Sequence, residues 1–149
     1  LPKTAWPPTL MSSRASNGVR FEDNVWLEAK FSSCTFDNVV MRKDYYHTCT
    51  FWNIVLTDCN AGRVSAEKSR FVGCKWENGI YSGSTFRKCD FLHLTVSHAS
   101  VGNMLFKDCV FRDTELEDVE FYNVIFKNCQ FGRMPGKLKG CKFIRCREL

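Results

Sequence analysis

Residues 106–131 read FKDCVFRDTELEDVEFYNVIFKNCQF, and an apolar residue occupies every fifth position of this stretch. These positions are Phe106, Phe111, Leu116, Phe121, Phe126 and Phe131. Counting back from Phe106 in steps of five reaches Phe21 through apolar residues only, so the series has 23 members. A second series, two residues earlier at each step, runs from Val19 to Cys129 and is nearly all small or apolar. This internal repeat organises the chain.

A period of five fits neither the helical period near 3.6 nor the strand period of 2, so neither element keeps these side chains on one face. If each unit of five residues is a short flat side followed by a corner, four units close a square coil of 20 residues. Both series then point into the lumen of the coil. Successive coils stack through parallel backbone ladders about 4.8 Å apart.

Residues 20 apart should then lie above one another, which gives a second test of the coil. One side stacks Phe31, Phe51, Phe71, Phe91, Phe111 and Phe131. The small residues of that side are Ala29, Cys49, Ser69, Cys89, Cys109 and Cys129. Another side stacks Trp26, Tyr46, Ala66, Phe86, Phe106 and Phe126. Because Ala66 interrupts this stack beside Ala61, we expect the third coil to be under-filled.

From Val19 to Phe131 the pattern resembles the pentapeptide-repeat family, whose fold is a right-handed quadrilateral β-helix. The resemblance implies an all-β parallel solenoid of about six coils. The sequence departs from the common family pattern, because Val, Ile, Thr or Tyr frequently precedes the large residue. Asp and Asn instead follow it by two positions, as at Asp108, Asp113 and Asn123. Their short polar side chains tolerate tight turns, so we expect them at the corners of the coil.

The repeat leaves room for one domain, residues 19–131, with a distinct segment at each end. Residues 1–18 predict a linker or capping arm, in which Trp6 and Leu10 cover the open first coil. Proline and serine in this segment argue against a retained signal peptide. No apolar run is long enough to span a bilayer, so we expect no membrane insertion of this chain.

After Phe131 the register slips by two and resumes with Leu138 and Phe143. Residues 132–149 therefore predict a loop followed by a partial coil that caps the far end.

Nine cysteines would normally suggest disulfides or a zinc site. Seven lie on the inward small-residue series: Cys34, Cys49, Cys59, Cys74, Cys89, Cys109 and Cys129. We expect them to be free thiols in the core, and Cys141 and Cys146 to be the one pair that could bridge or react. The three histidines, His47, His93 and His98, take outward positions on different sides. We therefore expect no metal site, and no cofactor is predicted.

Free thiols and the lack of N-x-S/T sequons favour a reducing, intracellular compartment. A luminal or extracellular compartment is the alternative.

The sequence contains no arrangement of residues typical of an enzyme, whether Ser-His-Asp order, phosphate loop or metal motif, so we expect a protein that is not an enzyme. Asp44 is the one carboxylate on the inward series. Burial could raise its pKa, and the neighbouring Tyr45 and Tyr46 could supply its partner. The alternative is that Asp44 turns outward at an irregular corner.

The outward positions predict three distinct surfaces. A basic wall collects Lys68, Arg87, Lys88, Lys107 and Lys127. An opposite acidic wall collects Asp37, Asp58, Glu77, Glu115, Glu117 and Asp118. A third wall stacks Trp52, Val72 and Leu92, with little charge expected beside them, and is the preferred partner-binding surface.

We therefore expect a non-catalytic scaffold or recognition module that binds a protein partner or a second copy of itself. Two alternatives come from the resemblance. The family includes inhibitors of type II topoisomerases that mimic DNA by an acidic surface, and the basic balance here, net +5, counts against that role. The luminal domain of synaptic-vesicle glycoproteins, a toxin receptor, is similar in its Phe and Cys content and implies a receptor-like luminal or extracellular domain. Nucleic-acid binding through the basic wall is a further alternative.

Overall fold

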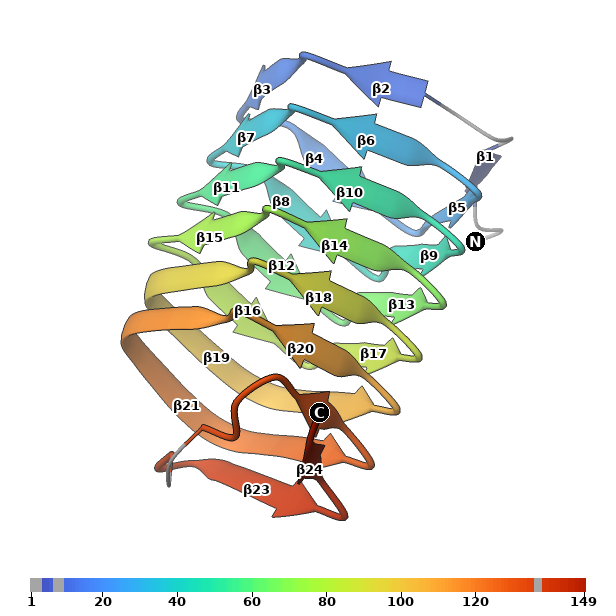
Figure 1. The fold of residues 1–149 in the computed structure, drawn as a ribbon. Helices are drawn as coiled ribbons and strands as arrows, with labels where there is room; N and C mark the ends of the chain where they lie inside the picture. The colour runs from blue at the N-terminus through green and yellow to red at the C-terminus, as the bar shows by residue number, and fades with distance from the viewer. Residues whose placement is uncertain (1–3, 7–9, 136–137) are drawn as a thin grey trace.

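The structure, a computed structural model, describes residues 4–6, 10–135 and 138–149. Strands of mostly three residues wind into a right-handed coil with four flat sides (Figure 1). The stacked strands pair in parallel, with partners 20 residues apart over most of the chain, as at Phe51 and Phe71. The predicted all-β parallel solenoid is confirmed.

Four sides follow one another around each coil, and two long strands pass through three of them. The first side contains β1 (Thr4–Trp6), β5 (Asn24–Leu27), β9 (Tyr45–His47), β13 (Ser65–Glu67), β17 (Thr85–Arg87), the last parts of β19 (Thr95–Lys107) and β21 (Glu115–Lys127), and β23 (Cys141–Ile144). The second side contains β2 (Leu10–Ser12), β6 (Lys30–Ser32), β10 (Thr50–Trp52), β14 (Arg70–Val72), β18 (Asp90–Leu92), β20 (Val110–Arg112), β22 (Gln130–Phe131) and β24 (Arg147–Glu148).

The remaining two sides share the long strands with the first. The third side contains β3 (Ala15–Asn17), β7 (Thr35–Asp37), β11 (Val55–Thr57), β15 (Lys75–Glu77) and the starts of β19 and β21. The fourth side contains β4 (Arg20–Glu22), β8 (Val40–Arg42), β12 (Asn60–Gly62), β16 (Ile80–Ser82) and the middle of β19 and β21.

The coil register begins earlier in the chain than expected. Eight strands stack on the second side, which corresponds to about seven turns instead of six. The added turn comes from the expected linker or arm: β1 pairs with β5, β2 with β6 and β3 with β7. The five-residue spacing continues back from Phe21 through Ser16 and Met11, but the polar Ser16 hid it. Leu10 is 73% exposed and does not cover the coil, while the Trp6 side chain lies outside what the structure describes.

A partial coil follows the loop after Phe131, as predicted. β23 pairs with β21 so that Phe126 faces Phe143, 17 residues later. The two rings stack at 5.0 Å between centroids. The last coil is therefore three residues shorter than the others.

Each corner uses a residue in the left-handed region, two positions after the large inward residue. At the non-glycine corners φ lies between 49° and 58°, a region that Asn and Asp tolerate best. Asp113 and Asn123 are such corners, as predicted. The corner conformation aims the backbone N–H at the next coil: the Asn53 N–H donates to the Val72 carbonyl at 2.8 Å. This hydrogen bond between coils offsets the conformational cost.

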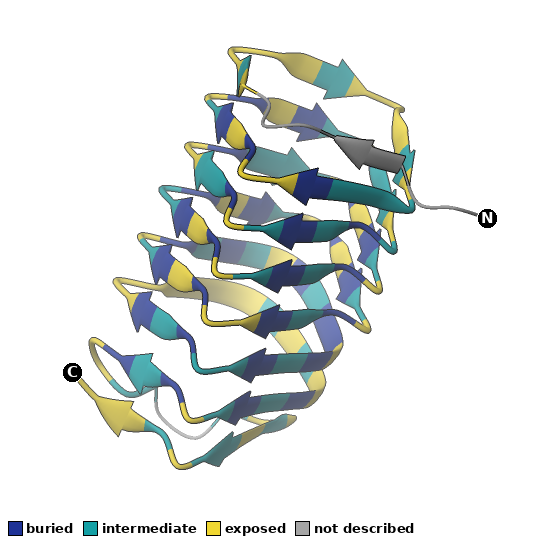
Figure 2. Cartoon of the chain, turned by 90° about the vertical axis from the view of Figure 1, so that its right-hand side faces the viewer, coloured by how far each residue is buried: buried dark blue, intermediate teal, exposed yellow. Residues whose placement is uncertain are grey.

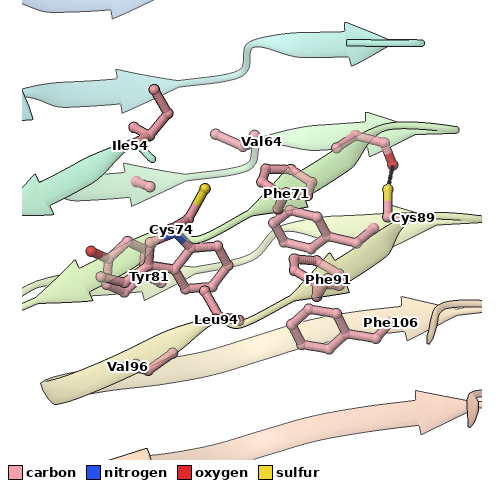
Figure 3. Close-up of a cluster of buried hydrophobic side chains, with 14 of the residues drawn as sticks. Ile54, Val64, Phe71, Cys74, Tyr81, Cys89, Phe91, Leu94, Val96 and Phe106 are labelled. Carbon is pink, nitrogen blue, oxygen red and sulfur yellow. Dashed lines mark hydrogen bonds between the residues drawn. The ribbon is translucent and has the colours of Figure 1, made fainter. Parts of the chain in front are cut away.

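Most members of both inward series form one continuous core along the axis, seen as the buried centres of the strands in Figure 2. Leu116 and Thr114 are exceptions, because both are exposed. Phe91 is 1% exposed and lies between Phe71 and Phe111, with centroid distances of 4.8 and 4.7 Å. Figure 3 shows Phe71, Phe91 and Phe106 in the core. The Phe91 ring also meets Phe106 of the first side edge-on, at 6.0 Å. Stacked and edge-to-face contacts of this kind add to the burial of the rings.

The stack on the first side breaks where the sequence predicts. Trp26 stacks on Tyr46 at 6.3 Å, and Phe86 stacks on Phe106 at 5.1 Å, with Ala66 between the two pairs. An apolar cavity of about 90 Å³ lies in the lumen there, and Ala61 and Ala66 are among its lining residues.

We expect Phe91→Ala to reduce the free energy of unfolding by about 3–5 kcal/mol, because it leaves a cavity between two stacked rings. Phe143→Ala is the matched control: Phe143 is half-buried and has a ring stacked on one face only, that of Phe126, with Phe131 edge-on, so its loss should be smaller. Denaturant unfolding measures both. A loss below about 1 kcal/mol for Phe91→Ala would place the ladder outside the core.

We expect Ala66→Leu to stabilise the protein by about 0.5–2 kcal/mol, because the added side chain enters the existing cavity. Ala29→Leu is the control: Ala29 is fully buried and does not line that cavity, so overpacking should destabilise it. Equal destabilisation of both variants in thermal unfolding would show that the cavity cannot accept a side chain.

Candidate functional site

The first candidate surface is an apolar strip formed by Trp52, Val72 and Leu92, the last residues of β10, β14 and β18. The strand registers place Trp52 opposite Val72, and Val72 opposite Leu92, so the predicted stack is present. Trp52 is 52% exposed, whereas Val72 and Leu92 are half-buried. The strip continues to Ser32 at one end and Arg112 at the other.

More charge flanks the apolar strip than the sequence analysis expected. The first residues of β6, β14 and β18 are Lys30, Arg70 and Asp90, all exposed. Arg112 stacks directly on Leu92. The expectation of little charge was wrong because it considered only the last residue of each strand. The first residue of each strand also points outward and forms a second column on the same face.

The structure brings the five residues of the basic wall together on the first side. Arg87, Lys107 and Lys127 lie opposite one another on β17, β19 and β21. Lys68 and Lys88 are corner residues, and their N–H groups donate to the carbonyls of Arg87 and Lys107 at 3.0 and 2.9 Å. The ion pairs within the described residues involve Arg20, His93 and His98, and none of these five cations.

The acidic wall lies on the third side, across the lumen from the basic wall. Asp37, Glu77, Glu115 and Glu117 belong to β7, β15 and β21, and Asp58 and Asp118 are corner residues. The walls of opposite charge are therefore on opposite sides of the solenoid, as the sequence predicts.

Two histidine–aspartate pairs were missed by the sequence analysis. His98 lies 3.0 Å from Asp118, and this hydrogen bond raises the pKa of the His98 ring. His93 lies 3.4 Å from Asp113 in the same way. In both pairs the aspartate follows the histidine by 20 residues, both at corners. The sequence signal for these pairs is the 20-residue spacing, which brings polar residues together across neighbouring coils just as it does apolar ones.

Four features now recur along the described chain: five residues per side, four sides per coil, a large and a small inward residue on each side, and a left-handed corner. The chain has the pentapeptide-repeat fold. This confirms the resemblance found in the sequence, and the repeat supplies the walls on which all the candidate surfaces lie.

A search of protein-family models finds no match, and a search of curated proteins finds none either. Several solved structures are similar in fold. A trypsin-treated form of QnrB1, a plasmid-mediated fluoroquinolone resistance protein, is 11% identical over 95% of this chain and 90% of that chain, with a TM-score of 0.48. A pentapeptide repeat protein from the cyanobacterium Cyanothece 51142 is 9% identical over 78% and 88%, with a TM-score of 0.36.

A putative glycosyl hydrolase from Parabacteroides merdae is 11% identical over 87% of this chain and 82% of that chain, with a TM-score of 0.50. At these identities the similarity concerns the fold alone.

Asp44 points into the core of the pentapeptide-repeat helix and is 1% exposed. Its Oδ1 accepts the Asn24 N–H at 2.9 Å, and the Tyr46 hydroxyl donates to its Oδ2 at 3.4 Å. Burial raises the pKa of Asp44. Tyr45 is not a partner, because its hydroxyl donates to Glu67 at 3.0 Å on the outer face.

Tyr46 does not complete an acid–base pair with Asp44 at neutral pH. Burial, followed by the nearby Asp44 charge, raises the pKa of Tyr46 well above its usual value. The phenol therefore keeps its proton and serves only as a donor. The arrangement fits a structural hydrogen-bond set better than a catalytic one.

All nine cysteines are free, and the seven on the inward series are buried. Their thiols do more than fill space: Cys59, Cys109 and Cys129 donate to backbone carbonyls of the preceding coil at 3.2–3.3 Å. Burial raises the pKa of the Cys74 thiol to about 11, so it is a poor nucleophile at neutral pH.

Cys141 and Cys146 do not bridge. Cys141 stacks on Val124, whereas the Cys146 thiol donates to the Phe126 carbonyl at 3.2 Å. The two thiols thus lie on different sides of the partial coil, Cys141 at the start of β23 and Cys146 directly before β24. Burial raises the pKa of Cys141 to about 11.

Within the part of the chain that the structure describes, no three His, Cys, Asp or Glu residues are placed to hold a metal ion. None of the described residues forms a helix of the length and apolarity needed to cross a membrane.

We expect Asp44→Asn to be more stable than wild type at pH 7. The folded pKa of Asp44 is raised, so its contribution to stability is complete below the unfolded value, about 3.9, and is lost as the pH rises through the folded value. Asparagine keeps an acceptor for the Asn24 N–H and carries no charge. The advantage of the variant should therefore shrink toward acid pH.

Denaturant unfolding at several pH values measures this difference. Asp58→Asn, at an exposed corner, is the control and should gain no advantage that grows with pH. If Asp44→Asn is instead less stable than wild type and the deficit grows as the pH rises, the ionised carboxylate itself stabilises the core.

Proposed function

We propose that this chain is a non-catalytic interaction scaffold whose apolar strip, Trp52, Val72 and Leu92, docks a protein partner. The observation that carries the proposal is the half-exposed Trp52 indole at the end of a registered apolar stack. Single exposed apolar residues are common on protein surfaces, but a contiguous patch on a flat face is typical of an interface.

The composition of the strip supports a protein partner. Tryptophan and arginine are enriched at the energetic centres of protein interfaces, and here Trp52 and Arg112 lie at the two ends of one column. Apolar surface contributes about 25 cal/mol per Å² when buried. Association costs several kcal/mol, so the strip needs the surrounding wall to complete an interface.

The flanking charges indicate how the wall would contribute. Lys30, Arg70 and Arg112 outnumber Asp90 beside the strip. A partner with an apolar centre and acidic residues around it would match this pattern.

The rigidity of the solenoid supports the same role. Each side is a parallel sheet fixed by hydrogen bonds to the coils on either side, so the strip is presented without rearrangement. A preorganised surface loses little conformational entropy on binding.

We expect the double variant Trp52→Asp, Leu92→Asp to fold and to lose the partner. Both side chains point outward, so the core should be intact. Ile80→Asp is the matched control, because Ile80 is also 52% exposed but lies on the fourth side. Affinity capture from cell extract, with bound proteins identified by mass spectrometry, compares the three proteins, and sedimentation tests self-association.

Two outcomes contradict the proposal. If circular dichroism shows that the double variant is unfolded, the strip belongs to the core. Alternatively, the double variant and wild type retain the same partners and the same oligomeric state, in which case the strip is not the contact surface.

A further inference from the structure

The basic wall holds positive charges in an arrangement that is unfavourable for the protein alone. Arg87, Lys107 and Lys127 lie directly opposite one another on adjacent strands, where like charges repel. Adjacent strands are about 4.8 Å apart, so the wall carries a column with one cation on each rung. Lys68 and Lys88 extend the charge along the neighbouring corner.

Two acidic groups lie beside this column: Glu67 is the strand partner of Arg87, and Asp108 is the corner residue that follows Lys107. Glu67 accepts the Tyr45 hydroxyl at 3.0 Å, and Asp108 accepts the Asn128 side-chain amide at 2.6 Å. Asp90 begins β18 on the second side, beyond the corner that Lys88 occupies. The described ion pairs lie elsewhere on the molecule, and from Arg87 through Lys107 to Lys127 the column holds three cations on successive rungs with no carboxylate between them.

A regular row of cations on a flat face fits a linear polyanion whose charges repeat at a similar distance. The outward residues that share the strands of the column are Thr85, Leu105 and Ile125, which are half-buried and carry no ring. Tyr45, one rung from the wall, stacks on His47 and is tied to Glu67. Nucleic-acid bases would therefore lack the aromatic platforms on which they usually stack.

A sulfated sugar polymer avoids this difficulty, because it requires no stacking and its charged groups repeat once or more per ring. Sulfate is a compact acceptor suited to the ammonium of lysine. We propose that the basic wall binds a linear sulfated polysaccharide, laid along the axis of the solenoid across the rungs of Lys68, Arg87, Lys107 and Lys127.

This ligand belongs to a luminal or extracellular compartment, the alternative that the sequence analysis left open. The free thiols are compatible with that compartment because seven of the nine are buried in the core, away from oxidants and partner thiols. Cys74, with a pKa of about 11, is an example. The inference does not depend on the apolar strip, which lies on another side of the coil.

The test measures binding of a size-defined heparin fragment to the whole chain by titration at several salt concentrations. The double variant Lys107→Glu, Lys127→Glu should bind heparin at least about tenfold more weakly. Its affinity should also fall less steeply with salt, because a wall with fewer cations releases fewer counterions from heparin on binding. Lys30→Glu, Lys75→Glu is the matched control. It makes the same change in net charge, lowering it by four, with both residues exposed and on other sides.

Arg87→Glu, Lys88→Glu is a second test variant, because both residues are exposed, whereas Lys107 and Lys127 are half-buried, and it should fold even if the first variant does not. Circular dichroism checks each fold. The proposal is overturned if the control loses as much affinity as the test variants, or if wild type does not bind heparin at physiological salt. Equal or tighter binding of an oligothymidine of matched length would also overturn it, in favour of a nucleic acid.

Discussion

The structure depends on one backbone constraint, the left-handed corner at every fifth residue. At that conformation the corner N–H points along the axis and donates to a carbonyl of the next coil, as Asn53 does to Val72. The bond fixes both the length of a side and the offset between coils. Residues 20 apart are then held in register, so each side chain lies beside the side chains at the same position of the neighbouring coils. Some corners use lysine, arginine or threonine, which adopt this region less readily than Asn or Gly.

Register has opposite effects inside and outside the coil. Inside, it places ring on ring, as in Phe71, Phe91 and Phe111, and thiol beside carbonyl, as in Cys109 and Phe86. Outside, the same register places like charges together on one side and apolar residues together on another. A globular fold can separate such residues by changing a loop. In a coil of fixed period, like charges on one column can be separated only by substituting residues. A column of like charges that is nevertheless present therefore calls for a functional explanation.

Most of the fold could be predicted because the period of five leaves few alternatives. The Phe31 to Phe131 ladder, the under-filled region at Ala66 and the partial coil at Phe143 all follow from spacing and side-chain size. The start of the repeat could not be predicted in this way, because the polar Ser16 interrupts the apolar series. The backbone pairing of the coils nevertheless continues through Ser16. Contacts that depend on the direction of individual side chains were harder to predict. The choice of Tyr46 over Tyr45 as the partner of Asp44 depends on which tyrosine faces inward, and the pairing of His98 with Asp118 required applying the coil length to polar residues as well.

The break in the aromatic stack at Ala66 has a mechanical meaning. Each coil touches only the coils before and after it, so cooperativity passes along the axis from neighbour to neighbour, and a weak interface interrupts it. The aromatic stack of the first side is therefore divided into an N-terminal block around Trp26 and Tyr46 and a C-terminal block around Phe86 and Phe106. At the level of the break the two blocks are joined by the second-side ladder, where Phe51 stacks on Phe71. Backbone amides of the third coil should open first, and a force applied along the axis would separate the two blocks there before it disrupts either one. The apolar strip begins at Trp52 on the N-terminal side of that break and ends at Leu92 on its C-terminal side, so a partner bound along the strip would hold the two blocks together.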